Sequence, residues 1–226
     1  MTATNEQAIA GQAVYTKKVL FAYDILVLGI SSRYIWKCPS KIIEQHYNRH
    51  ISSNHLDVGV GTGYFLDRCQ FPSSTPRIAL MDMNPNSLDF VSRRIARYKP
   101  ETWQQNILEK IESDIAPFDS VGVNYLFHCL PGAIEEKAVA FDHLKSVMKP
   151  GARIFGSTIL QEGVKIGWAA RKLMSLYNKR GIFGNAEDGV VSLEVALRQR
   201  FVDVQIDIVG CVALFSAKVH DARGSA

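Results

Sequence analysis

The sequence predicts an α/β fold with a mostly parallel sheet, and three observations lead to this fold class. Apolar runs at 55–58 and 77–81 are each followed by a glycine-rich or polar segment and then by helix-like spacing. The first run leads into Gly59, Gly61 and Gly63, whose backbone amides can approach a ligand closely at the carboxyl end of a strand. Near the end of the chain, two runs with a period of two residues flank Gly210, which predicts an antiparallel hairpin.

The glycine-rich segment 55–65 reads HLDVGVGTGYF. A dinucleotide-binding loop has its third glycine five residues after the first, whereas Gly63 comes four residues after Gly59. This spacing, with Asp57 two residues before the first glycine, resembles the first motif of class I S-adenosylmethionine-dependent methyltransferases. The resemblance implies S-adenosylmethionine as cofactor and S-adenosylhomocysteine as its product. The residues that it implies in cofactor binding here are Asp57, Gly59, Gly61, Thr62 and Gly63.

The second predicted strand, 77–81, is closed by Asp82. A carboxylate at the tip of this strand can accept hydrogen bonds from both ribose hydroxyls, so Asp82 is the expected ribose ligand. Asn84 and Pro85 follow as a helix start, with Asn84 as the N-cap and Pro85 in the first turn. In the family that this segment resembles, the residue after the acid lies against the adenine, which implies that role for Met83.

A third strand is predicted at 102–107, in the place of a family segment that ends in an aspartate beside the adenine amino group. This chain has Asn106 there. An amide oxygen can still accept a hydrogen bond from that amino group. The resemblance therefore implies that Asn106 and the neighbouring Ile107 contact the cofactor.

Three further segments complete the expected sheet. The fourth strand, 118–124, resembles the family's FDxVxxN block and ends in Asn124, an expected cofactor contact. Residues 148–153 resemble the family's LKPGG turn before the fifth strand, and 201–206 with 211–218 form the predicted hairpin. The resemblance covers residues 54–219 and implies a Rossmann-like sheet of seven strands, mostly parallel, with a C-terminal antiparallel hairpin.

The segment 124–132 begins where the fourth strand ends, which in this fold lies beside the transferred methyl group. An oxygen nucleophile or an activated carbon must lose a proton during transfer, and imidazole titrates close to neutral pH. His128 is the histidine that the motifs place nearest this point, so we predict that it acts as the catalytic base. The alternative is that His128 positions the loop or the substrate.

Residues 1–53 precede the sheet and are expected to form a helical cover. Their aromatic series resembles the N-terminal segment of ubiquinone and menaquinone C-methyltransferases. In a functional interpretation Tyr15, Tyr23 and Trp36 close over the methionine end of the cofactor and exclude water. In the structural alternative they are core residues of an amphipathic helix.

A second cover is predicted at 161–200, inside the core region 54–226 that makes one domain with the N-terminal segment. Its expected elements are a helix over 162–177, a tight loop at 182–185 and a final helix over 190–201. This segment passes over the methyl donor in the fold that the sequence resembles. Trp168, Tyr177 and Phe183 can wall an aromatic acceptor or, alternatively, pack against the sheet.

Composition excludes several other classes of protein. The 226 residues carry a net charge of only +4, and the densest basic group, Arg93 to Lys99, falls on the outer face of a predicted helix, so no nucleic-acid partner is expected. No signal peptide is expected because the first residues are polar. The apolar stretch 19–30 is too short to span a membrane. The four cysteines are scattered singly, which favours reduced thiols in the cytoplasm and no metal site.

We therefore predict an enzyme that transfers a methyl group from S-adenosylmethionine to oxygen or carbon of a small aromatic or polyketide-like metabolite. Phrases at 128–132, 156–160 and 177–183 resemble small stand-alone methyltransferases of secondary metabolism. The expected assembly is a monomer or homodimer. Three alternatives stay open: a quinone-biosynthesis C-methyltransferase, a protein or RNA methyltransferase, and a non-catalytic cofactor-binding scaffold. The second lacks its usual N/D-P-P-Y/F motif after Asn124, and the intact glycine loop with Asp82 argues against the third.

Overall fold

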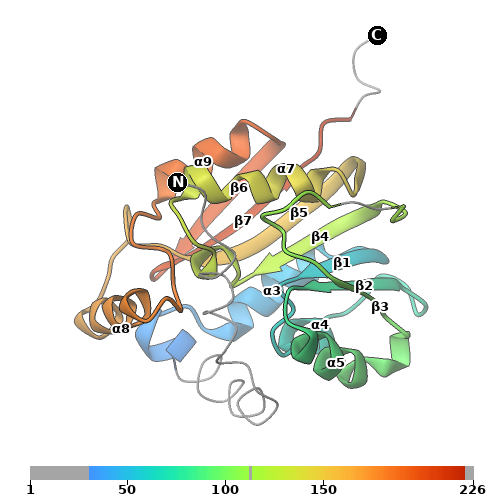
Figure 1. Ribbon diagram of the computed structural model, residues 1–226, viewed down its shortest axis with the longest axis horizontal. Helices are drawn as coiled ribbons and strands as arrows, with labels where there is room; N and C mark the ends of the chain where they lie inside the picture. The colour runs from blue at the N-terminus through green and yellow to red at the C-terminus, as the bar shows by residue number, and fades with distance from the viewer. Residues whose placement is uncertain (1–30, 112–113, 222–226) are drawn as a thin grey trace.

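The computed structural model describes residues 31–111 and 114–221 (Figure 1). Tyr15, Tyr23 and most of the expected N-terminal cover lie outside these ranges. The strands are β1 (Asn54–Val58), β2 (Arg77–Asp82), β3 (Glu101–Gln104), β4 (Phe118–Asn124), β5 (Met148–Ile159), β6 (Val202–Val209) and β7 (Val212–Lys218). The helices are α3 (Ser40–His50), α4 (Tyr64–Arg68), α5 (Pro85–Arg94), η2 (Ala96–Tyr98), η3 (Phe127–Cys129), α6 (Ile134–Lys137), α7 (Val139–Lys145), α8 (Trp168–Lys179) and α9 (Val190–Arg198).

The strands form one seven-stranded sheet in the order β3-β2-β1-β4-β5-β7-β6. The first five strands in this order are parallel to one another, whereas β7 runs antiparallel to both β5 and β6. The chain goes outward from β1 through β2 to β3 and then returns to the other side of β1 with β4. The carboxyl ends of β1 and β4 therefore flank the point at which the strand order reverses, where open α/β sheets bind ligands.

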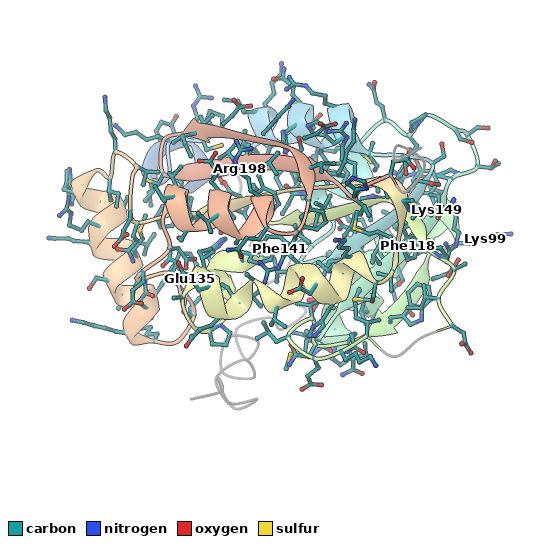
Figure 2. All side chains as sticks on the ribbon, turned by 90° about the horizontal axis from the view of Figure 1, so that it is seen from above. Lys99, Phe118, Glu135, Phe141, Lys149 and Arg198 are labelled. Carbon is teal, nitrogen blue, oxygen red and sulfur yellow. The ribbon has the colours of Figure 1, made fainter. Side chains whose placement is uncertain are left out.

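Helices cover both faces of the sheet (Figure 1). On one face α6, α7 and α9 bury an apolar cluster that includes Phe141, Leu197 and Phe215, and Figure 2 looks onto this side. On the other face α3, α4, α5 and α8 pack around Tyr47, Phe155 and neighbouring residues. Both faces of the sheet are therefore buried, as apolar strands in a parallel sheet require. None of the helices in the described ranges is long and apolar enough to cross a membrane.

Local sequence explains where α5 begins. The Oδ1 atom of Asn84 accepts a hydrogen bond from the backbone N–H of Asn86 at 2.9 Å, and Pro85 occupies the first turn. This is the predicted N-cap arrangement, which satisfies one of the unpaired amides at the helix start. Because α5 starts three residues after β2 ends, the cap also fixes the short loop that carries Met83.

Three expected elements have different bounds in the structure. Strand β3 ends at Gln104 rather than Ile107, so Asn106 and Ile107 belong to the loop that follows it. Helix α8 begins at Trp168 rather than at Glu162, because Glu162 instead forms an isolated parallel bridge with Gly189. Residues 148–153, expected as a turn before the fifth strand, are already part of β5. The other strands and the hairpin agree with the prediction within a few residues.

Candidate functional site

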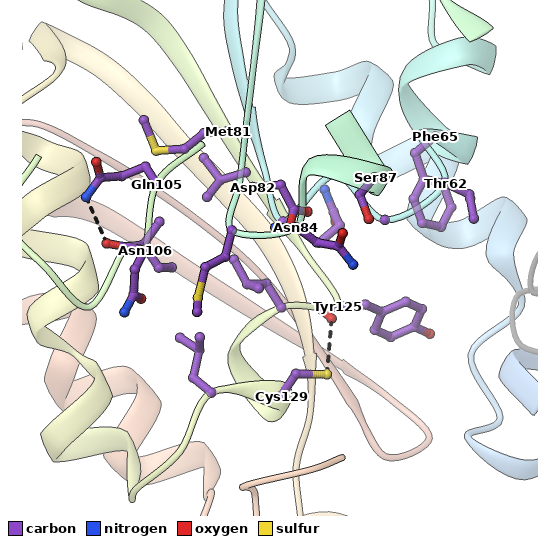
Figure 3. A pocket seen from close by; sticks show the side chains of 18 of the residues that line it. Thr62, Phe65, Met81, Asp82, Asn84, Ser87, Gln105, Asn106, Tyr125 and Cys129 are labelled. Atoms are coloured by element: carbon purple, nitrogen blue, oxygen red, sulfur yellow. Dashed lines mark hydrogen bonds between the residues drawn. The ribbon is translucent and has the colours of Figure 1, made fainter. Parts of the chain in front are cut away.

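A cavity lies at the carboxyl ends of β1, β2 and β4, and we call it the glycine-loop cavity (Figure 3). Segments that are far apart in the sequence contribute to it: the loop after β1, the β2–α5 loop, the loop after β3 and the turn after β4. Its lining comprises Val58, Gly59, Gly61, Thr62, Tyr64, Phe65, Met81, Asp82, Met83, Asn84, Ser87, Gln105, Asn106, Ile107, Asn124, Tyr125, Leu126, Cys129, Leu130, Pro131 and Ile182. This position is the topological switch point of the sheet.

The glycines of the loop share a backbone conformation, but Gly61 and Gly63 have different surroundings. All three have left-handed φ values, between +53° and +67°, which glycine adopts without strain. A Cβ on Gly61 would meet no atom within 4 Å, so the backbone there borders open space at the cavity. A Cβ on Gly63 would lie 2.6 Å from Val91 of α5, and Gly63 does not line the cavity. Gly61 therefore leaves room at the cavity, whereas Gly63 leaves room for helix packing.

Asp82 ends β2 with its carboxylate at the centre of this arrangement (Figure 3). Its Oδ1 atom accepts a hydrogen bond of 2.8 Å from the backbone N–H of Asn84. Burial raises the pKa of Asp82 to about 6, and the backbone N–H groups of Asn84, Gly61 and Val60 oppose this shift. The carboxylate is thus held by backbone donors and remains a lining group of the cavity.

Asp57 lies behind the glycine loop and does not line the cavity. Its Oδ1 atom accepts a hydrogen bond of 2.9 Å from the Tyr47 hydroxyl on α3. That hydroxyl lies 3.0 Å from Nε2 of His55, and Nδ1 of His55 lies 2.8 Å from the Ser120 hydroxyl on β4. A buried polar chain therefore ties the acid of the motif to α3 and β4.

The last residue of β4 carries a buried polar atom at the cavity. The Nδ2 atom of Asn124 is buried and finds no hydrogen-bond partner within the described part of the chain, while its Oδ1 accepts from the Ser157 hydroxyl. Tyr125 follows with a φ of +54°, an uncommon conformation for a tyrosine and one that concentrates at functional sites. Both residues line the cavity. An unpaired buried donor at a cavity wall is costly unless a ligand satisfies it.

His128 lies in the turn after β4, within η3, and is buried. Only 4% of its surface is exposed, and it lines neither cavity described here. Its Nδ1 atom lies 3.4 Å from the backbone N–H of Ile159, which donates to it. Burial, with the nearby charge of Lys137, lowers the pKa of His128 to about 3. Within its surroundings the imidazole is neutral at physiological pH and acts as a hydrogen-bond acceptor.

Of the described aromatic residues expected to cover the site, three lie together and Trp168 lies apart from them. Trp36, which is buried, lies with its ring 6.0 Å from that of Phe183, and Phe183 is 5.0 Å from Tyr177 and 4.6 Å from His128. These side chains form one cluster beside the turn after β4. Trp168 is separate from it, because 77% of its surface is exposed and Lys172 lies over its ring.

A second cavity adjoins the first and shares Cys129 and Pro131 with it. The other lining residues of this second cavity are Gly132, Ala133, Glu136, Asn178, Gly181, Phe183, Gly184, Ala186 and Glu187. They come from the turn after β4, from α6, from the end of α8 and from the segment that follows α8. The turn after β4, with Cys129 and Pro131, therefore separates the two cavities, and we call it the partition.

Eight of the ten residues expected at the cofactor line the glycine-loop cavity, and Asp57 with Gly63 does not. Sequence reasoning missed Tyr125, Ser87 and Gln105, although Tyr125 and Gln105 are neighbours of Asn124 and Asn106 in the chain. It also missed Cys129 and Pro131, whose place in the partition depends on how the turn folds. Among the residues that the structure describes, no group of three or more His, Cys, Asp or Glu is arranged to hold a metal ion.

Comparison with known proteins agrees with this geometry. A family model described as a methyltransferase domain matches residues 56–154. A demethylluteothin O-methyltransferase of Streptomyces thioluteus is 41% identical over 217 residues, which cover 96% of this chain and 94% of that protein. A physcion biosynthesis cluster O-methyltransferase of Aspergillus chevalieri is 35% identical over 209 residues, covering 92% of this chain and 94% of the relative.

Solved structures show the same fold. The N-methyltransferase NodS from Bradyrhizobium japonicum WM9, in complex with S-adenosyl-L-homocysteine, superposes with a TM-score of 0.61 at 13% identity. The alignment covers 96% of this chain and 99% of that one. At this identity the likeness concerns the architecture alone, and it confirms the predicted fold class.

Proposed function

The chain belongs to the class I S-adenosylmethionine-dependent methyltransferases, and we propose that it methylates a hydroxyl oxygen of a small aromatic or polyketide-like metabolite. The observation that carries this proposal is the second cavity, which adjoins the glycine-loop cavity across Cys129 and Pro131. A methyl donor in the glycine-loop cavity and an acceptor in the second cavity would meet at this partition. Both named relatives are O-methyltransferases, which favours oxygen over carbon as the attacked atom.

The glycine-loop cavity suits S-adenosylmethionine in three respects. The space beside Gly61 accommodates a ligand against the backbone, Asp82 offers a carboxylate for ribose hydroxyls, and Nδ2 of Asn124 is a donor without a partner among the described groups. We propose Met83, Asn106 and Ile107 for the adenine side. When bound, the cofactor supplies an electrophilic methyl group on a sulfonium, and in-line placement of the acceptor provides much of the acceleration.

The raised pKa of Asp82 gives an expected pH dependence of cofactor binding. A carboxylate accepts two hydroxyl hydrogen bonds better than a protonated acid does, so affinity for S-adenosylhomocysteine should fall as pH drops through about 6. The limiting slope is about tenfold per pH unit for one proton. Calorimetry at a series of pH values from about 5 to about 8 measures the affinity on both sides of this pKa. Asp82→Asn is the control that lacks the titrating group. An equal slope in both proteins would assign the titration elsewhere.

The second cavity favours an uncharged acceptor. Glu136 and Glu187 line it, and no lysine or arginine is among its described lining residues. An anionic substrate would therefore meet like charges on entry. Phe183 supplies an aromatic wall, in keeping with a planar acceptor. Tyr177 and Trp36 line neither cavity, and we propose that they support this wall through their contacts with Phe183. Trp168 is left outside the site.

His128 remains a predicted base, but its surroundings favour the positioning alternative. A buried imidazole with a pKa near 3 has little tendency to take a proton at neutral pH. We therefore expect His128→Asn, measured at saturating substrates, to lose less than the roughly 10²-fold that removal of a general base costs. A larger loss of turnover, with the acidic limb of the pH–rate profile abolished in the variant, would reinstate catalysis by His128.

Methyl transfer to a panel of compounds tests the proposed function. Purified protein is incubated with radiolabelled S-adenosylmethionine and with phenols, hydroxypyrones and hydroxyquinones, each beside its O-methylated counterpart. Transfer to the free hydroxyl compounds and not to the blocked ones supports oxygen methylation. Equal transfer to both would indicate attack by carbon, and binding without transfer to any compound would favour a non-catalytic scaffold.

We further propose that the protein is cytoplasmic and acts as a monomer or homodimer. We also propose that residues 161–200 form a cover over the site.

A further inference from the structure

Lys137 is a charged residue in an unusual place at the end of α6. Its side chain is 0% exposed, although lysine is almost never fully buried unless it is paired. The ammonium donates hydrogen bonds to the carbonyl of Phe127 at 3.1 Å, to the carbonyl of Gly184 at 3.0 Å and to Oδ2 of Asp188 at 2.9 Å. These partners use all three of its donors.

The three acceptors belong to two separate segments: Phe127 follows β4, whereas Gly184 and Asp188 both lie in the connection between α8 and α9. Phe127 begins η3, the turn whose continuation supplies Cys129 and Pro131 to both cavities. Gly184 lies in the loop after α8 and lines the second cavity. The carbonyl of Asp188 in turn accepts the backbone N–H groups of Gln161 and Glu162, which follow β5. The Lys137 side chain therefore joins the segments that follow β4 and α8, and the backbone carbonyl of Asp188 joins the latter to the segment after β5.

The segments that Lys137 connects also contact each other closely. The backbone N–H of Gly184 donates to the carbonyl of His128 at 2.9 Å. A Cβ on Gly184 would collide with the carbonyl of Leu130, so the two backbones pack against each other without an intervening side chain. Movement of the loop after α8 would therefore displace the partition, and movement of the partition would change both cavities.

Stability alone does not account for such a pair, since replacing a buried ion pair by apolar residues of similar volume is often neutral or stabilising. What the ammonium adds is geometric, because it holds the backbone carbonyls of Phe127 and Gly184 and the carboxylate of Asp188 at once. This inference rests on the function proposed above: we propose that Lys137, together with Asp188, is a positioning residue for methyl transfer. It holds the partition and the loop that contains Gly184 in fixed positions relative to each other, and so keeps the shape of the second cavity that receives the acceptor. Lys137 lines neither cavity, which is why its role is one of positioning.

The test compares Lys137→Met with the double variant Lys137→Met/Asp188→Leu. The single variant leaves Asp188 buried and unpaired and should lower the unfolding temperature, whereas the double variant restores an apolar match. In the folded double variant, kcat/KM for the panel compound turned over fastest should fall roughly 10- to 100-fold, the scale of small misplacements. The Kd for S-adenosylhomocysteine should stay within about twofold, and the Gly184 amide should exchange at least about tenfold faster.

Lys145→Met is the matched control, because Lys145 also donates to a backbone carbonyl, that of Arg200, away from both cavities. A double variant with wild-type kcat/KM and wild-type exchange at Gly184 would overturn the proposal, as would equal losses in Lys145→Met. If the wild-type protein methylates no compound in the panel, the proposed function fails separately. The Gly184 exchange rate then decides alone whether Lys137 holds the loop: faster exchange supports the proposal and unchanged exchange overturns it.

Discussion

Asp82→Ala should weaken binding of S-adenosylhomocysteine by roughly 1.5–3 kcal/mol, the range for hydrogen bonds to a charged group. This corresponds to roughly 10- to 150-fold in Kd at 25 °C. The physical reason is that the substitution removes a cavity-lining carboxylate, which can accept hydrogen bonds from the ribose hydroxyls. Titration calorimetry at pH 7.5 (about 1.5 units above the carboxyl pKa, so that the native group is ionised) measures the difference.

The control for this variant is Asp67→Ala. Asp67 lies on α4 near the same loop, where it binds Arg94 and Arg97, but it does not line the cavity. Removing it tests whether loss of any nearby carboxylate weakens binding. A folded Asp82→Ala protein with unchanged affinity would remove Asp82 from the cofactor site. Equal losses in the two variants would point to a general electrostatic effect instead.

Local chemistry explains why some of this site was predictable. A glycine with a left-handed φ, an acid at a strand end and an asparagine before a proline each restrict the backbone within a few residues. Gly61, Asp82 and Asn84 therefore occupy the positions that their neighbours in the chain indicate. The alternation of side chains along β1 also carries information, since Asp57 shares the side of His55 that faces α3.

Elsewhere, contacts with distant residues override the local pattern. Residues 162–167 have helical spacing, but Glu162 pairs with Gly189, and its N–H donates to the carbonyl of Asp188. Strand β3 stops early because the Asn106 side chain accepts the N–H of Leu108 and closes a turn. In each case the competing partner or turn determines where the element ends.

Lys137 is the clearest example of a residue whose role the sequence conceals. In the chain it is one charge in the run Glu135-Glu136-Lys137, which predicts a solvated helix end. Its ionic partner, Asp188, is 51 positions away. Only the folded turn after β4 brings Phe127 and Gly184 to the same ammonium. Burial of such a group depends on tertiary packing, which no window of neighbouring residues encodes.

Gly61→Val should abolish measurable binding of S-adenosylhomocysteine, with a loss larger than the roughly 100-fold that 2.7 kcal/mol represents. The new side chain would point into the open space that a Cβ at this position meets, and a ligand held against the loop would collide with it. The protein itself should still fold. The left-handed conformation costs a non-glycine residue roughly 1–2 kcal/mol, which a domain of this size tolerates.

Gly151→Val separates these two effects. Gly151 has a similar left-handed φ, +75°, and a Cβ there would approach only Asp221, at 3.8 Å or more, so the backbone strain is matched without an obstruction at the cavity. We expect the two variants to lose similar amounts of thermal stability, whereas only Gly61→Val loses the ligand. Retained affinity in a folded Gly61→Val protein would mean that the cofactor does not approach this loop. A comparable loss of affinity in Gly151→Val would mean that destabilisation, and not obstruction, explains the result.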